Sequence, residues 1–293
     1  MSGPKAQAGA KAPTIGQALE LARARGVERL DAQLLLLHAM AHPPGQPPHG
    51  RAWLQAHADE ALALDAVHRF ATLVERAAIG EPLAYQIGER AFFGLVLRVD
   101  RRVLIPRADT ETLVRWALEL VDAARSSVPV PTRAIDLGTG SGAIALALKH
   151  MRPSLLVAAI DASEEALCVA RDNASRLGLD VAFAVGNWLE GVHQSYDLIV
   201  SNPPYIAQND RHLDQLRHEP QRALVSGTDG LDDLRAIIGQ ARARLTPTGW
   251  LVVEHGYDQG PAVRQLFLAN GFALVTTRRD LEGQERCTGG QTK

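Results

Sequence analysis

The sequence has very little cysteine and no obvious cluster of metal ligands. Cys168 and Cys287 are its only cysteines among 293 residues, and neither has another cysteine or a histidine at ligand spacing. His38 and His42 are four residues apart, but no carboxylate or third histidine accompanies them, so we interpret them as an ordinary helix end. These absences argue against a disulfide framework, predict no metal site and favour the reducing cytoplasm.

Long apolar runs are also missing, although 46% of the residues are hydrophobic. No stretch approaches the ~20 consecutive apolar residues that a membrane-spanning helix needs. The first 13 residues are small and polar, with no apolar run after their lysines, which predicts an irregular start rather than a signal peptide. We therefore expect no association with a membrane.

An excess of charge of either sign is the third absence. Lys and Arg total 31, and Asp and Glu total 33. Binding to long nucleic acids usually relies on a strongly basic face, so this balance predicts that no direct nucleic acid contact is required. The chain is longer than the usual single domain of ~100–200 residues, and two domains are expected.

Residues 1–85 predict a small helical domain. Leu and Ala recur there at three- and four-residue intervals, which is the period of an amphipathic helix. The periodic segments are 15–26, 30–40 and 61–78. Thr14 is a suitable N-cap for the first helix, and the segment HPPGQPPHG must be a loop between helices.

Residues 86–106 change to a two-residue period. The short β runs FGLVLRV and RVLIP lie on either side of Asp100, Arg101 and Arg102. This pattern predicts a β-hairpin linker that turns at those three residues.

From residue 107 to residue 293, strand and helix patterns alternate. The predicted strands are 133–137, 155–161, 181–185, 197–201, 250–254 and 272–277, and the predicted helices are 143–151, 163–177, 231–245 and 259–270. Such alternation is typical of an α/β fold with a doubly wound, mainly parallel sheet. Ligands of these folds bind beyond the carboxyl ends of the strands.

A glycine-rich turn follows the first of these strands. It consists of Gly138, Thr139, Gly140, Ser141 and Gly142 and leads into the apolar helix AIALALKHM. Glycines allow a sharp turn and let a ligand touch the main chain, which suits either a pyrophosphate or a sulfonium nucleoside. The motif alone therefore leaves the cofactor class open.

Two more candidate ligand residues follow neighbouring strands. Asp161 ends the second strand, where a carboxylate can accept hydrogen bonds from both hydroxyls of a ribose; the alternative is a helix cap, although Ser163 is itself a competent cap. Trp188 follows the third strand with Asn187 and is placed to line an adenine pocket, or else belongs to the core.

The most discriminating motif is Asn202, Pro203, Pro204 and Tyr205 at the end of the strand YDLIVS. The prolines fix the backbone and leave carbonyl oxygens without competing N–H donors. Asn202 adds a side-chain carbonyl, and Tyr205 adds a flat ring. A planar NH2 group could thus be held by acceptors and stacked in line with a methyl sulfonium, which predicts methyl transfer to an amide or aryl amine nitrogen.

Taken together, IDLGTGSG, Asp161, Asn187-Trp188 and SNPPYI resemble class I amino methyltransferases. The segments LDAQLLLLHAM, GEPLAYQIGERAFFGLVLRVDRRVLIPRADTETLV, LVVEHG and GQERCTGG narrow this resemblance to the release factor glutamine methyltransferases of the PrmC/HemK family. It covers nearly the whole chain from about residue 14. One departure is Ala108, where the family commonly has proline; Arg107 and Glu111 are kept.

The resemblance implies a class I S-adenosylmethionine-dependent fold with a seven-stranded sheet, an N-terminal helical domain (1–85) that recognises the substrate, a linker (86–106) and a methyltransferase domain (107–293). It implies methylation of the glutamine in the Gly-Gly-Gln motif of class 1 peptide chain release factors, giving N5-methylglutamine. Residues 138–142, Asp161 and Trp188 would hold S-adenosylmethionine. Asn202 would touch donor and substrate, and residues 203–205 would complete the glutamine slot, with Asn202, Pro203 and Tyr205 as the catalytic residues.

Rival interpretations remain open at the level of the sequence. A glutamine methyltransferase of a ribosomal protein would share NPPY, and a DNA adenine-N6 methyltransferase would need a basic target-recognition region that is missing here. A non-catalytic binding module would have lost the donor-binding residues.

Glu254 and His255 end another strand, but no base is required before transfer. The chain's own Gly-Gly-Gln at 289–291 imitates the substrate motif, which we interpret as chance.

Overall fold

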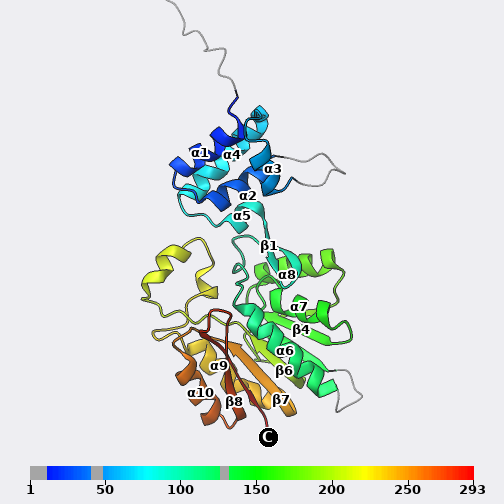
Figure 1. The fold of residues 1–293 in the computed structure, drawn as a ribbon. Coiled ribbons are helices and arrows are strands. Elements are labelled where there is room, and N and C mark those ends of the chain that lie inside the picture. Colours follow the sequence, from blue (N-terminus) through cyan, green and yellow to red (C-terminus); the bar gives the residue numbers. More distant parts are fainter. Residues whose placement is uncertain (1–11, 41–48, 126–131) are drawn as a thin grey trace, which may run out of the picture. The chain divides into compact units, whose positions relative to one another are not determined.

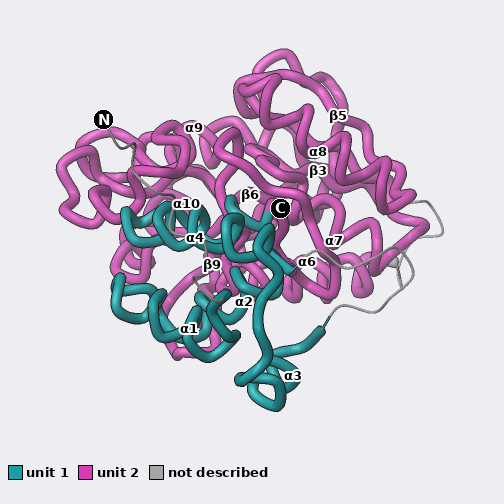
Figure 2. Tube along the Cα trace, turned by 90° about the horizontal axis from the view of Figure 1, so that it is seen from above, with its two compact units in different colours: residues 1–87 teal, residues 88–293 magenta. Residues whose placement is uncertain are grey.

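The computed structural model describes residues 12–40, 49–125 and 132–293 and divides into two compact units, residues 1–87 and 88–293 (Figure 2). Helices of the first unit are α1 (Ile15–Ala24), α2 (Arg29–Ala39), α3 (Arg51–Ala56), α4 (Leu64–Ala78) and α5 (Leu83–Ile87). Their apolar faces bury one cluster that includes Ile15, Leu35, Leu54 and Phe70. The predicted helices are confirmed, but α3 and α5 are too short to show a helical period.

Thr14 caps α1 as predicted. Its hydroxyl accepts a hydrogen bond from the Gln17 backbone N–H at 3.3 Å, and the Gln17 side chain accepts one from the Thr14 N–H at 2.9 Å. This reciprocal capping box satisfies two N–H groups that the first turn leaves unpaired. His38 lies in the last turn of α2, and His42 lies outside the described residues. No cluster of three or more potential metal ligands occurs in the described part of the chain.

The hairpin that opens the second unit turns earlier than predicted. Strands β1 (Glu89–Phe92) and β2 (Leu95–Arg98) pair in antiparallel fashion, with Phe92 opposite Leu95. The two turn residues, Phe93 and Gly94, have positive φ angles of 47° and 80°, the conformation that matches the twist of paired strands. The prediction that the hairpin turns at residues 100–102, with its second strand over RVLIP, was therefore wrong.

A local side-chain contact explains that error. The Asp100 carboxylate accepts hydrogen bonds from the Arg102 backbone N–H at 3.0 Å and from the Arg102 guanidinium, so the chain does turn there. The segment beyond it runs toward Pro106, which has no N–H to donate to a neighbouring strand. The turn is real, but no strand follows it.

The sheet of the second unit has seven strands in the order β5-β4-β3-β6-β7-β9-β8 (Figure 1). They are β3 (Arg133–Leu137), β4 (Leu156–Asp161), β5 (Ala182–Val185), β6 (Tyr196–Ser201), β7 (Leu245–Glu254), β8 (Ala273–Arg279) and β9 (Glu285–Gln291). All neighbouring pairs from β5 to β7 are parallel, and β9 is antiparallel to both of its neighbours. The predicted doubly wound, mainly parallel sheet is confirmed.

Helices cover both faces of this sheet. They are α6 (Thr110–Arg125), α7 (Ala143–Met151), α8 (Glu164–Leu177), α9 (Asp232–Ala241) and α10 (Gly260–Ala269). Alternate strand residues enter opposite clusters: Ala134 packs with α6 and α7, whereas Ile135 packs with α9 and α10. A strand buried on both sides is continuously apolar, which explains runs such as LIV in β6. The sequence analysis overlooked α6, although Leu113, Ala117 and Val121 follow a helical period.

The Gly-Gly-Gln near the chain's end belongs to β9, which pairs with β7 on one side and β8 on the other. A Cβ added at Gly289 would lie 2.7 Å from the Trp116 ring, and one added at Gly290 would lie 2.8 Å from Phe267. Close packing against these aromatic rings therefore accounts for both glycines.

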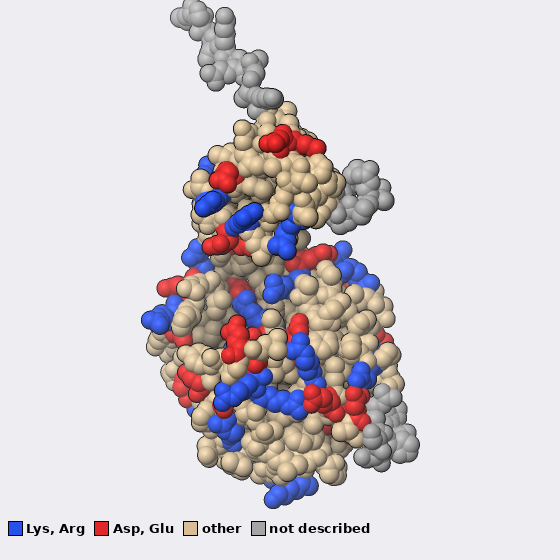
Figure 3. Space-filling view, viewed as in Figure 1, with Lys and Arg blue, Asp and Glu red and all other residues tan. Residues whose placement is uncertain are grey.

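Surface charge is mixed on the face of residues 88–293 seen in Figure 3, where basic and acidic side chains alternate. Arg278, for example, pairs with Glu119 at 2.6 Å. None of the described helices is long and apolar enough to cross a lipid bilayer.

Candidate active site

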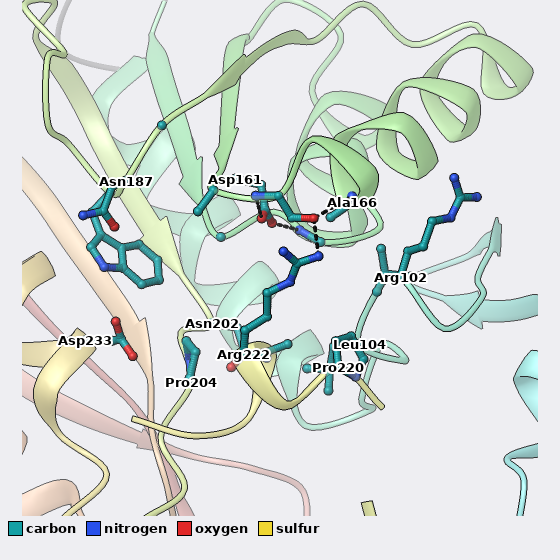
Figure 4. A pocket seen from close by; sticks show the side chains of 18 residues that line it. Arg102, Leu104, Asp161, Ala166, Asn187, Asn202, Pro204, Pro220, Arg222 and Asp233 are labelled. Carbon is teal, nitrogen blue, oxygen red and sulfur yellow. Dashed lines mark hydrogen bonds between the residues drawn. The ribbon is translucent and has the colours of Figure 1, made fainter. Parts of the chain in front are cut away.

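The site lies where the carboxyl ends of four adjacent strands, β5, β4, β3 and β6, meet at one edge of the sheet. A cavity at this edge brings together predicted residues that are up to 66 positions apart, from Gly138 to Pro204 (Figure 4). The predicted residues that line it are Gly138, Gly140, Asp161, Trp188, Asn202 and Pro204. Residues that the sequence analysis had not assigned to the site include Leu104, Pro220, Arg222 and Asp233.

The glycine loop divides into a cavity side and a structural side. Gly138 and Gly140 face the cavity with φ angles of 70° and 56°. Gly142 lies outside the cavity lining, and an added Cβ there would come within 2.9 Å of Leu146. Thr139 and Ser141 are buried and also lie outside the lining: the Thr139 hydroxyl donates to Asp136 at 2.6 Å, and the Ser141 carbonyl oxygen accepts from the Asn173 side chain at 3.0 Å.

Asp136 is a feature that the sequence analysis missed. It lies under the glycine loop, fully buried, and its Oδ2 accepts hydrogen bonds from the Thr139 hydroxyl and from the Ala145 N–H. Its Oδ1 has no partner among the described residues. Burial raises the pKa of Asp136 to about 7, because a carboxylate loses its hydration there. The signal was present in the sequence as one acid among the apolar residues that follow Arg133 in the strand RAIDL.

Asp161 ends β4, and both of its carboxylate oxygens already accept backbone hydrogen bonds. Oδ2 accepts from Gly140 N–H at 2.8 Å, and Oδ1 accepts from Ser163 N–H at 2.9 Å. Each carboxylate oxygen has a second lone pair, so the group still has capacity for hydroxyl ligands. The cap of α8 is Ser163, whose hydroxyl accepts from Ala166 N–H at 3.1 Å.

Trp188 packs its ring against the glycine loop. An added Cβ at Gly138 would lie 3.1 Å from the indole, so glycine permits this close approach. The backbone of Trp188 has a φ of 52°, which is unusual for a bulky residue and is typically found where the surrounding structure fixes a functional side chain. The half-buried indole forms one wall of the cavity.

Asn202 presents an unsatisfied acceptor at the end of β6. Its Nδ2 donates to the Thr110 hydroxyl at 3.1 Å, whereas its buried Oδ1 has no hydrogen-bond partner in the part of the chain that the structure describes. A buried carbonyl without a partner costs about 1–3 kcal/mol. Asn202 also lines the cavity, and a buried polar atom without a partner in a cavity-lining residue is typical of a ligand site.

The rest of the motif is divided between cavity and core. Pro204 lines the cavity, Pro203 is buried, and Tyr205 lies outside the lining. The Tyr205 hydroxyl donates to Glu254 Oε1 at 3.3 Å, and its carbonyl oxygen accepts from the Gln259 side chain at 3.0 Å. Burial raises the pKa of Tyr205, and the Glu254 carboxylate raises it further.

Glu254 and His255 are both fully buried at the end of β7 and do not line the cavity. Burial raises the pKa of Glu254 to about 7 and lowers the pKa of His255. Both ring nitrogens of His255 are already engaged, one with the Gly256 carbonyl oxygen and one with the Thr288 hydroxyl, each at 2.8 Å. Neither side chain has the exposure that a base acting on a ligand requires.

One wall of the cavity comes from the segment that contains Pro220 and Arg222. The Arg222 guanidinium donates to the Ser163 hydroxyl at 2.5 Å, beside Asp161 (Figure 4). The buried Glu219 carboxylate pairs with Arg107 and accepts the Ile105 N–H at 3.1 Å. Arg107 of the IPRADTE motif therefore anchors this wall.

Comparisons with known proteins agree with this geometry. A model of the Methyltransferase small domain matches residues 120–272, and a model of the PrmC N-terminal domain matches residues 17–88. The chain is 50% identical to a release factor glutamine methyltransferase of Xylella fastidiosa over 278 residues, which cover 94% of this chain and 97% of that protein. It is 45% identical to the protein of the same name from Pseudomonas aeruginosa, over 90% of this chain and 92% of that one.

A solved structure supports the fold. A methyltransferase from Pyrococcus furiosus superposes with a TM-score of 0.50 at 18% identity, covering 76% of this chain and 97% of that chain. At this identity the likeness concerns the fold alone.

Proposed function

Because this chain belongs to the release factor glutamine methyltransferase family, we propose that it methylates a class 1 peptide chain release factor. The proposed acceptor is the side-chain amide nitrogen of the glutamine in the Gly-Gly-Gln motif, and the product is N5-methylglutamine. The methyl donor is S-adenosylmethionine, which supplies an electrophilic methyl group on a sulfonium.

The donor side of the cavity fits this cofactor. Asp161 retains acceptor capacity for the ribose hydroxyls, and Trp188 offers a flat wall for the adenine. Gly138 and Gly140 leave room for the ligand against the main chain. Asp136 lies below the loop and outside the cavity lining, and a cation bound above it would favour its ionised form. Thr139, Ser141 and Gly142 support the loop from the core side.

The unpartnered Asn202 Oδ1 carries the acceptor assignment. An amide NH2 group would satisfy this buried atom, and the rigid Pro203-Pro204 backbone offers carbonyl oxygens beside it. Holding the amide in this way aligns its nitrogen lone pair with the methyl group. The same acceptors stabilise the positive charge that develops on nitrogen during transfer.

No base is needed before transfer in this arrangement, because the proton leaves once nitrogen has gained the methyl group. This agrees with the burial of Glu254 and His255 outside the cavity lining. The Tyr205 hydroxyl donates to Glu254. Tyr205 would therefore contribute its ring, and not its hydroxyl, to the glutamine slot.

The substrate-recognition role belongs to the helical unit in this proposal. Residues 17–88 match the PrmC N-terminal domain, and the unit has a core of its own. Contacts with the body of a release factor would supply binding energy that orients the glutamine. Removing residues 1–87 should therefore reduce methylation of the intact factor and leave binding of S-adenosylmethionine unchanged. Because the proposed acceptor works in translation, we also propose that the activity takes place in the cytoplasm.

The test is an incubation of the purified protein with labelled S-adenosylmethionine and one acceptor at a time. The acceptors are a full-length release factor, the same factor with its motif glutamine replaced by alanine, a ribosomal protein and duplex DNA. Mass spectrometry should find the mass of one added CH2 group on the Gly-Gly-Gln peptide of the intact factor only. Label in the ribosomal protein or DNA, but not in the factor, would refute the proposal.

A further inference from the structure

Resting on the proposed function, we propose that Arg222 binds the carboxylate in the methionine part of S-adenosylmethionine and so selects the intact donor. Arg222 lies in the single-turn 3-10 helix η2 (Gln221–Ala223) and lines the cavity. The sequence motifs provide for the adenine, the ribose and the transferred methyl group, but they assign no partner to this carboxylate.

The order of the groups in the donor decides where its methionine part lies. Asn187 lies at one end of the cavity and Arg102 at the other (Figure 4). Asp161 and Arg222 lie between them. The donor links adenine, ribose, sulfonium and methionine part in that order. With the adenine on Trp188, which follows Asn187, and the ribose at Asp161, the methionine part has to extend toward Arg102 and Arg222.

The methionine part carries the only anionic group of the donor. Its α-carbon bears an ammonium and a carboxylate, whereas the adenine and ribose are uncharged and the sulfonium is positive. Arg102 and Arg222 are the basic side chains among the described residues that line the cavity. One of these two guanidiniums is therefore the candidate partner of the carboxylate.

Arg102 is already committed to a carboxylate of the protein. Its Nε donates to one oxygen of Asp100 at 2.9 Å, and a terminal nitrogen donates to the other oxygen at 2.6 Å. This paired contact occupies one fork of the guanidinium and neutralises its charge. Arg102 is consequently the weaker of the two candidates.

Arg222 has both charge and hydrogen-bonding capacity to spare. A guanidinium carries five N–H groups, and within the described chain this one donates to the Ser163 hydroxyl at 2.5 Å. It also forms a loose ion pair with Glu165 at 3.6 Å, a carboxylate whose side chain is largely exposed. Because the Ser163 N–H donates to Asp161, the Ser163 contact holds the guanidinium beside the ribose site.

The charges of the cavity match those of the donor. Two carboxylates line it, Asp161 and Asp233, and the donor brings two positive groups, the sulfonium and the ammonium. With Arg102 neutralised by Asp100, Arg222 is the remaining positive charge among the described lining residues, and the donor has one carboxylate to match it. A ligand without that carboxylate would leave Arg222 facing positive groups only, which adds repulsion to the loss of a contact.

Calorimetry without any acceptor tests this assignment. S-adenosylmethionine is compared with its decarboxylated form, which keeps the sulfonium and the ammonium and has hydrogen in place of the carboxylate. Arg222→Gln should reduce the preference for the intact donor, measured as the ratio of the two dissociation constants, by roughly three- to tenfold. A larger factor is not expected, because 56% of the Arg222 side chain is exposed and water screens the ion pair.

Three further variants separate a direct contact from an effect of overall charge. Arg102→Gln removes the other guanidinium of the cavity, and Arg211→Gln removes one from the same connection between β6 and α9, outside the lining. At physiological salt both should change the preference less than about twofold. Arg222→Lys keeps the charge without the planar fork, so its preference should fall between those of the unmodified protein and Arg222→Gln. An unchanged preference in Arg222→Gln, or loss of the preference in Arg102→Gln instead, would overturn the inference.

A third ligand reports whether the cavity itself is intact. The compound 5′-methylthioadenosine lacks the whole amino-acid part of the donor, so Arg222 would have nothing to contact. Its affinity should agree within about twofold between the unmodified protein and Arg222→Gln, well below the tenfold that 1.4 kcal/mol represents. An equal loss of affinity for all three ligands would mean that Arg222 only supports the fold, and would overturn the inference. These measurements use no release factor, so a failure to methylate any factor would refute the proposed function without changing the donor preference.

Discussion

The donor half and the acceptor half of the site are built in different ways. Several contacts of the donor half are short-range, such as Asp161 with Ser163, two residues away, and Thr139 with Asp136, three residues away, and Gly140 with Asp161 spans 21 residues. The acceptor half depends on side chains that meet over long stretches of sequence, with Asn202 and Thr110 separated by 92 residues and Tyr205 and Glu254 by 49. Donor binding should thus tolerate changes in distant elements better than acceptor alignment does.

The largest effect that follows from this comparison concerns Asn202. Asn202→Ala removes the buried acceptor and should lower kcat by about 10²–10³-fold, the usual cost of losing one preorganised polar contact to the transition state. The folding midpoint should change little, because the alanine also removes an unpaired buried atom. Steady-state kinetics and thermal unfolding measured on the same preparation test this. Turnover at the wild-type rate would remove Asn202 from the mechanism.

A pH effect on stability should distinguish the buried carboxyls. Burial raises the folded-state pKa of Glu254 from 4.5 to about 7, despite the opposing charge of Arg286. A raised carboxyl pKa gives stability that is fully present below pH 4.5 and is lost as the pH rises toward 7. Compared with Glu254→Gln, the unmodified protein should therefore lose on the order of 3 kcal/mol between these pH values.

Urea unfolding of both proteins at pH 5 and pH 8 measures this difference. Asp136 titrates in the same direction but is present in both proteins, so its contribution cancels. Asp109, Tyr205 and Cys287 also face Glu254 and are retained in both. A constant difference in stability across the pH range would show that Glu254 is hydrated in the folded protein.

Asp161 tests the donor half. Asp161→Ala should weaken binding of S-adenosylmethionine by roughly 1.5–3 kcal/mol, the range for hydrogen bonds to a charged group. It should also lower stability, because the N–H groups of Gly140 and Ser163 lose their acceptor. Calorimetry with S-adenosylhomocysteine measures the affinity, and Asp172→Ala, on the outer surface of α8, is a control for the loss of one carboxylate. Unchanged affinity would contradict the ribose assignment.

The sequence predicted the donor half more completely than the acceptor half, for the same physical reason. The limits of β3 and α7 follow from local apolar patterns and the glycine turn, and both match the structure to the residue. The motif at Asn202 to Tyr205 was also evident. Its support by Thr110 and Glu254 was not, because nothing local in the sequence says which strands are neighbours. Tyr205 is an example. The sequence predicted that its ring would help form the acceptor slot, but it did not predict that Glu254 would be the hydrogen-bond partner of its hydroxyl.

Tyr205→Phe should produce the smallest effect and sharpen the comparison most. The ring stays in place, while the hydrogen bond to Glu254 Oε1, at 3.3 Å, is lost. Because Thr110 still accepts from the Asn202 side chain, the Asn202 amide should remain oriented. The expected loss in kcat is about two- to tenfold, equivalent to ~0.5–1.5 kcal/mol for one hydrogen bond. Kinetics with the release factor should thus place Tyr205→Phe between wild type and Asn202→Ala. A Phe variant as impaired as Asn202→Ala would mean that the hydroxyl of Tyr205, and not only its ring, is needed to use the acceptor.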